Sequence, residues 1–141
     1  MTRARWAALA PLTAVLVAVV TGCGQSSAGS EDTTSCTDTK TESGMTIALT
    51  TSPCPIRGGK SANARVTVKD TAGAVVKDAA VKVVTDMPSM NMHGGDQAAA
   101  PNGDGYETKL VLGMGGDWDV KVEVSRGSSP PAAVIFQINA K

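Results

Sequence analysis

Aromatic residues and histidine are scarce in this chain. Among its 141 residues there are one histidine, one tyrosine, one phenylalanine and two tryptophans. So few aromatic rings exclude a stacking platform for nucleic acid bases. The 13 basic residues are balanced by 13 acidic ones and do not cluster, whereas a nucleic acid surface needs concentrated positive charge. We therefore expect no nucleic acid partner.

Catalytic and hard-metal motifs are missing as well. His93 has no serine or free cysteine nucleophile in an evident constellation, so triad chemistry has little support. The acidic residues do not follow the spacing of a calcium-binding loop. A zinc site is not favoured, because there is one histidine and two of the three cysteines are expected to pair in a disulfide. The chain is therefore expected not to be an enzyme.

The N-terminus has the pattern of a targeting segment. Arg3 and Arg5 precede an apolar run over residues 7–20, which is too short to indicate a membrane span. The run closes on Val20-Thr21-Gly22-Cys23, which resembles the lipobox of bacterial lipoproteins. That resemblance implies a signal peptide over residues 1–22, a lipidated Cys23, and an anchor on the extracytoplasmic face of the cell membrane. The alternative is an ordinary secretory peptide that is cleaved elsewhere.

Two further cysteines and a polar segment follow. In an oxidising compartment Cys36 and Cys54 are expected to form a disulfide worth about 3 kcal/mol. The competing interpretation is a thiolate metal site. Residues 23–44 are rich in Ser, Thr, Gly, Asp and Glu, which predicts a flexible tether. The folded domain is then expected over residues 45–141.

From Met45 onward the apolar residues recur with a period of two. The clearest case has Trp118, Val120, Val122 and Val124 alternating with Asp119, Lys121 and Glu123. Such alternation indicates strands with one buried face, and Gly- and Pro-rich turns separate the runs. The pattern predicts an all-β, Ig-like antiparallel β-sandwich of six or seven strands with Trp118 near the centre of its core. A small open barrel is the alternative.

The most informative segment is Met87-Pro88-Ser89-Met90-Asn91-Met92-His93. It holds three of the six methionines and the only histidine. Thioether sulfur and imidazole are soft to borderline ligands that favour Cu(I). The glycines that follow His93 indicate a loop. The segment predicts a Cu(I) or Ag(I) site.

We expect Met90, Met92 and His93 to be the ligands of that site. Met87 and Met114 are either further ligands or core residues, since methionine also fills gaps in apolar cores. Met114 approaches the segment only if the strand end at Met87 and the strand end at Met114 lie at the same pole of the sandwich.

A family resemblance rests on several of these motifs. They are Val66-Thr67-Val68-Lys69-Asp70, Met87-Pro88-Ser89-Met90, Gly105-Tyr106, and the run from Gly113 to Val120. This pattern resembles the YtkA-like domain and is similar to the soluble part of FixH-type proteins. The resemblance implies an Ig-like fold outside the cytoplasm and a link to copper or respiratory-chain maturation, but no known reaction. The chain lacks the further histidines of dedicated copper chaperones.

These features predict a membrane-anchored lipoprotein that binds or delivers Cu(I), serving oxidase assembly or metal tolerance. Its partners would be the membrane, through the lipid anchor, and a membrane protein or copper protein that receives the metal. The alternative is a metal-free interaction module that docks a membrane protein. An Ig-like fold accommodates both functions, so the fold does not decide between them.

Overall fold

The computed structural model describes residues 34–141, which form an all-β domain. The predicted fold class is confirmed, but the domain has eight strands rather than six or seven. The strands are β1 (Cys36–Glu42), β2 (Met45–Ser52), β3 (Ser61–Lys69), β4 (Ala80–Met87), β5 (Met92–Asn102), β6 (Gly105–Val111), β7 (Gly116–Ser125) and β8 (Ala132–Ala140). A single 3-10 turn, η1 (Pro88–Met90), is the only helical element of this part of the chain.

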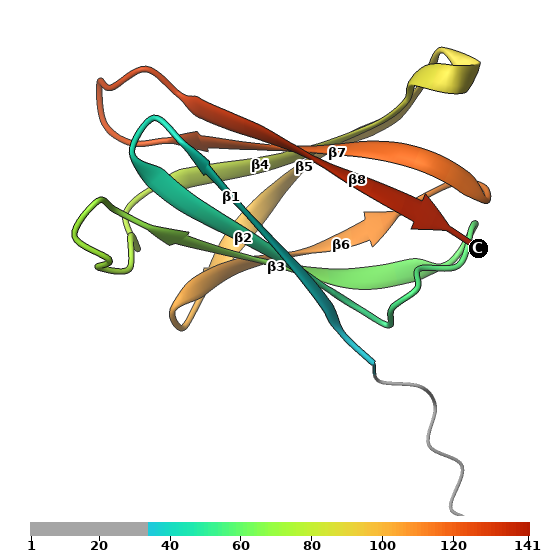
Figure 1. Cartoon of the computed structure of the whole chain (residues 1–141), viewed down its shortest axis with the longest axis horizontal. Helices are drawn as coiled ribbons and strands as arrows, with labels where there is room; N and C mark the ends of the chain where they lie inside the picture. The colour runs from blue at the N-terminus through green and yellow to red at the C-terminus, as the bar shows by residue number, and fades with distance from the viewer. Residues whose placement is uncertain (1–33) are drawn as a thin grey trace, which may run out of the picture.

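All neighbouring strands are antiparallel, in the order β1-β2-β3-β6-β5-β4-β7-β8. The two layers share β5, whose residues 92–99 pair with β4 and whose residues 100–102 pair with β6. At the other side of the molecule the two outer strands β1 and β8 come close to each other at one end (Figure 1). There Lys40 Nζ donates a hydrogen bond of 2.6 Å to the Ile135 carbonyl. The sandwich is therefore close to a closed barrel.

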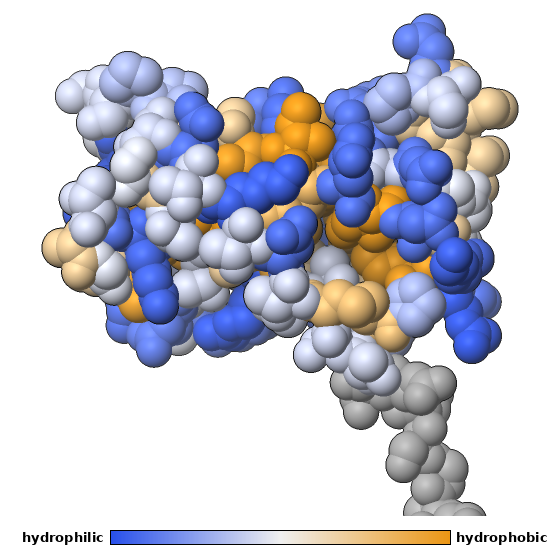
Figure 2. Space-filling model, in the orientation of Figure 1, coloured by the Kyte–Doolittle hydropathy of each residue, from blue (hydrophilic) through white to orange (hydrophobic). Residues whose placement is uncertain are grey.

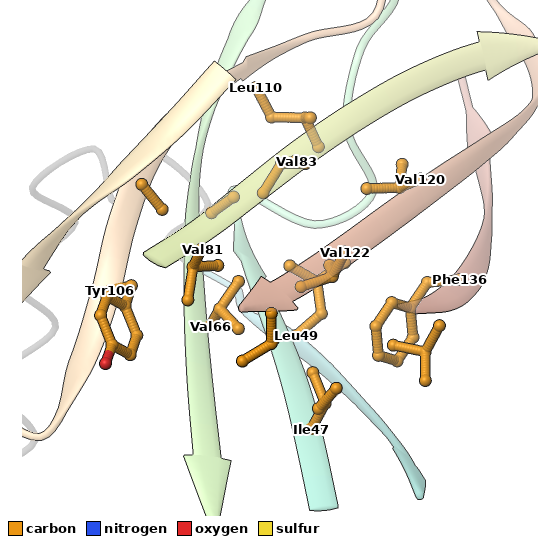
Figure 3. Close-up of a cluster of buried hydrophobic side chains, with 14 of the residues drawn as sticks. Ile47, Leu49, Val66, Val81, Val83, Tyr106, Leu110, Val120, Val122 and Phe136 are labelled. Atoms are coloured by element: carbon orange, nitrogen blue, oxygen red, sulfur yellow. The ribbon is translucent and has the colours of Figure 1, made fainter. Parts of the chain in front are cut away.

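The core lies between the two layers and has the predicted alternation. In β7, Trp118, Val120, Val122 and Val124 are all buried. Figure 3 shows the valines of β4 and β7 facing side chains from β2, β3 and β6. Trp118 lies towards one end of this core, because its indole Nε1 donates to the carbonyl of Met114 in the β6–β7 connection, at 3.1 Å. Burial of this apolar surface is the main force that holds the layers together.

The predicted start of the folded domain is wrong by one strand. β1 lies within residues 23–44, which were expected to be a flexible tether, and all seven of its residues are exposed. A strand without a buried face has no apolar alternation that a sequence pattern can reveal. Main-chain pairing with β2, from Cys36↔Thr51 to Glu42↔Met45, holds it in place.

β5 was also missed, because its sequence is rich in glycine and alanine and contains Pro101. These residues are depleted in strands and predict a loop. Met92 and His93 therefore begin a strand rather than lying in a loop.

The predicted disulfide is confirmed. Cys36 in β1 is bonded to Cys54 in the connection after β2, with a Cα–Cα distance of 5.6 Å. The signal peptide, Cys23 and the first part of the tether lie outside the described residues. Within residues 34–141 no helix has the length and apolar character needed to cross a membrane.

Candidate functional site

The methionine-rich segment forms a tight connection at one end of the sandwich. Met87 is the last residue of β4, η1 turns the chain, and Asn91 has a left-handed backbone with φ of 48°. The backbone N–H of Asn91 donates to the Pro88 carbonyl at 3.2 Å. Because the chain turns between them, Met90 and Met92 do not lie on one extended strand. Each thioether is positioned by a different element.

Met114 lies at the same end of the molecule. Figure 1 shows η1 and the β6–β7 connection at this end, close to the C-terminus. The Met87 Cε atom is only 2.8 Å from the point that a Cβ on Gly116 would occupy, and Gly116 is two residues after Met114. We call this end, made of residues 87–93 and 112–116, the methionine end. The strand ends that carry Met87 and Met114 thus meet at one pole. This was the condition for Met114 to approach the segment.

The four methionines of this end differ in exposure. Met90 is 61% exposed and Met114 is 41% exposed, whereas Met87 is only 2% exposed. Met92 is partly buried and packs against the core. Met87 is therefore a core residue, which was one of its two predicted roles. Met114, in contrast, is a surface residue and does not cap the core.

Five residues of the segment and its neighbour Asp86 line a shallow hollow on the surface. The lining residues are Asp86, Met87, Pro88, Asn91, Met92 and His93. The hollow brings Met92 and His93 together, and Met90 and Met114 lie outside its lining. The structure thus gathers the predicted ligands at one end without building a closed cage around a metal.

His93 is held between two carboxylates. Its Nδ1 lies 2.7 Å from Asp86 Oδ1, and its Nε2 lies 3.2 Å from Asp96 Oδ1. The hydrogen bond with Asp86 is the largest cause that raises the pKa of His93 above its ordinary value, and the charges of Asp86 and Asp96 add to it. Partial desolvation opposes the rise. A metal that binds Nε2 therefore competes with a proton for this nitrogen.

A bulge in β5 makes this arrangement, and the sequence analysis missed it. Asp86 pairs with His93 and Thr85 pairs with Gly95, so Gly94 is an extra residue in the ladder. The bulge places His93 and Asp96 on the same outer face of the sheet. The pair of glycines after His93 was the available signal, because glycine inside a strand often marks a bulge.

A second hollow lies between the outer strands β1 and β8. Its apolar lining includes Leu49, Ile56 and Phe136, next to the Cys36–Cys54 disulfide. Figure 2 shows hydrophobic surface between β1 and β8. It contains no titratable pair or soft ligand other than the oxidised cysteines, so it offers no chemistry of its own.

Oxygen, nitrogen and thiolate ligands do not supply a complete metal site. Within residues 34–141, no group of three or more His, Cys, Asp or Glu side chains is arranged to hold a metal ion. A site with three or more protein ligands at the methionine end would therefore include thioether sulfur. Thioethers are ligands for Cu(I) rather than for Zn²⁺, Mg²⁺ or Ca²⁺.

Comparison with known proteins gives a family match. A family model described as YtkA-like matches residues 39–123, from β1 into β7. The matched range includes the whole methionine end. No curated protein and no solved structure matches the chain. The similarity to FixH-type proteins stays a prediction.

Proposed function

The chain belongs to the YtkA-like family, and on that premise we propose that it binds and delivers Cu(I) outside the cytoplasm. In this proposal Cys23 anchors the protein to the membrane, and the methionine end carries the metal in the service of oxidase assembly or metal tolerance. The protein binds its cargo and does not transform it, so no catalytic activity is proposed.

The exposure of Met90 carries the proposal. A thioether that is 61% exposed contributes little to the core, and exposed apolar side chains at one place often mark a binding surface. Met92 and His93 lie beside it on the adjoining hollow. Two sulfurs and one imidazole nitrogen are a sufficient set for low-coordinate Cu(I). Met114 is a fourth donor at the same end, while burial makes Met87 a support for the turn.

The open geometry favours delivery over storage. The donors come from a turn, a strand start and a second connection, and no closed cage surrounds them. A partner protein can therefore approach the metal directly and take over one ligand at a time. A carboxylate such as Asp86 on the other ring nitrogen is a common arrangement for metal-binding histidines, since it fixes the ring orientation.

The decisive experiment is an anaerobic Cu(I) titration of residues 34–141 against a chromophoric Cu(I) chelator. This fragment contains all eight strands and the entire core. We expect one equivalent of Cu(I) to bind. The Met90→Leu/Met92→Leu variant should lose at least about tenfold in affinity, or ~1.4 kcal/mol, while its melting temperature stays unchanged.

Met45→Leu is the matched control, because Met45 lies at the start of β2, away from the methionine end. It should bind Cu(I) as the parent does. Trp118, the only tryptophan in the fragment, reports binding through its fluorescence, since it contacts the Met114 carbonyl. Failure to bind Cu(I) at micromolar concentration would contradict the proposal. The metal-free docking module would then be the better hypothesis, and the hollow between β1 and β8 its first candidate surface.

A further inference from the structure

The pairing of His93 with Asp96 is imposed by the backbone. In a regular strand, residues three apart point to opposite faces, and only the bulge at Gly94 puts these two on the same face. Gly94 is exposed to solvent on one side and closely packed on the other, where a Cβ would lie 2.5 Å from Thr85 Oγ1 and 2.7 Å from Trp118 Cζ3. One side of the bulge therefore packs against Thr85 and Trp118. Its other side faces solvent and carries two neighbouring donor atoms, His93 Nε2 and Asp96 Oδ1.

These two donors have the separation of a chelating pair. His93 Nε2 and Asp96 Oδ1 are 3.2 Å apart, and two neighbouring ligands at about 2.0 Å from a metal lie about 2.8 Å from each other. Lys82 Nζ lies 3.6 Å from the other oxygen, Asp96 Oδ2, so Oδ1 remains available on the side of the histidine. Asp86 holds Nδ1 and leaves Nε2 as the nitrogen that faces the metal.

The surrounding charge favours a divalent ion. Asp86 and Asp96 flank His93, and Asp119 lies directly opposite Asp86 in the neighbouring strand β7. Like charges in opposite positions of a sheet repel each other, and a bound cation relieves that repulsion. Two lysines on this face, Lys82 and Lys121, both bond Glu123, at 2.9 Å each.

We propose that His93 Nε2 and Asp96 Oδ1 form a Cu(II) site next to the thioether site, so that the methionine end accepts copper in both oxidation states. Nitrogen and oxygen ligands in a tetragonal arrangement suit Cu(II), which is the most strongly bound divalent ion of the first transition row. Water fills the other positions. The two sites share only His93, so one copper ion occupies this end at a time.

The test is a titration of residues 34–141 with a Cu(II) salt, followed by electron paramagnetic resonance and by Trp118 fluorescence. The N-terminus is acetylated so that its amine does not bind the metal. We expect one equivalent of Cu(II) with hyperfine coupling to a single imidazole nitrogen. Asp96→Asn should weaken Cu(II) binding by about tenfold or more, whereas one equivalent of Cu(I) should still bind. Asp104→Asn, at the opposite end of the sandwich, is the matched control and should bind as the parent does.

Met90→Leu/Met92→Leu should have the opposite selectivity, losing Cu(I) and keeping Cu(II). An unchanged Cu(II) affinity in Asp96→Asn, or in His93→Gln, would overturn the inference. So would the absence of Cu(II) binding up to about 100 μM. In each case Cu(I) binding by the parent would leave the thioether site intact, so failure here is distinguishable from failure of the proposed function. All the substituted side chains are wholly or partly exposed, and melting temperatures will show that the variants fold.

Discussion

Each ring nitrogen of His93 has its own carboxylate partner, and the two partners are not equivalent. Asp86 is 2.7 Å from Nδ1, while Asp96 is 3.2 Å from Nε2. A histidine whose pKa is raised is protonated over a wider pH range than an ordinary one. This has two consequences for the residue: its charge contributes to folding, and its proton competes with copper for Nε2.

We predict that Asp86→Asn lowers the pKa of His93 towards its ordinary value, because the hydrogen bond with Asp86 is the main cause of the rise. Asp96→Asn should lower the pKa by less. A pH titration followed by NMR measures both effects directly, since His93 is the only histidine and its ring signals are unambiguous. A larger drop in Asp96→Asn than in Asp86→Asn would contradict the prediction.

The raised pKa of His93 also makes the free energy of unfolding depend on pH, and the sign of that dependence is known. Because the folded pKa lies above the ordinary value of about 6.5, protonated His93 favours the folded state. This contribution is fully present below pH ~6.5 and is lost as the pH rises through the folded pKa. The side chain is well exposed to solvent, so salt should weaken the effect.

At the scale of elements, the bulge between β4 and β5 links the surface site to the core. Gly94 fits against Thr85 and Trp118 with no room for a side chain, and Gly95 has a φ of 131°, which favours glycine. The two glycines thus perform different tasks, close packing in the first case and backbone conformation in the second. Together they fix where His93 and Asp96 lie.

We predict that Gly94→Ala lowers the free energy of unfolding by about 1–3 kcal/mol, the usual cost of forcing a methyl group into a filled space. Trp118 emission should shift at the same time, because the new methyl group presses on its ring. Gly113→Ala is the matched control, since nothing lies within 4 Å of its added Cβ. Chemical denaturation measures both variants. Equal stability of the two would show that the bulge is more compliant than its contacts indicate.

For the whole molecule, sequence patterns predict those parts that are held by burial. The alternation in β7 was readable because Val120, Val122 and Val124 are buried while the residues between them face water. β1 could not be predicted from the sequence, because main-chain pairing and a disulfide, rather than burial, hold it in place. The site divides in the same way. The soft ligands of the methionine end are visible in the sequence, whereas the contacts of His93 arise from the register of β4 against β5.

The dependence of β1 on pairing and on the disulfide leads to a prediction about the stability of the whole sandwich. We expect Cys36→Ser/Cys54→Ser to lower the free energy of unfolding by about 3 kcal/mol, because the disulfide spans 18 residues and restricts the unfolded chain. Since no residue of β1 is buried, its amides should exchange with solvent much faster in the variant, while those of β7 keep most of their protection. Denaturation and hydrogen exchange together measure both effects. If β1 and β7 lost protection equally, β1 would be a cooperative part of the core layers rather than a strand attached at their edge.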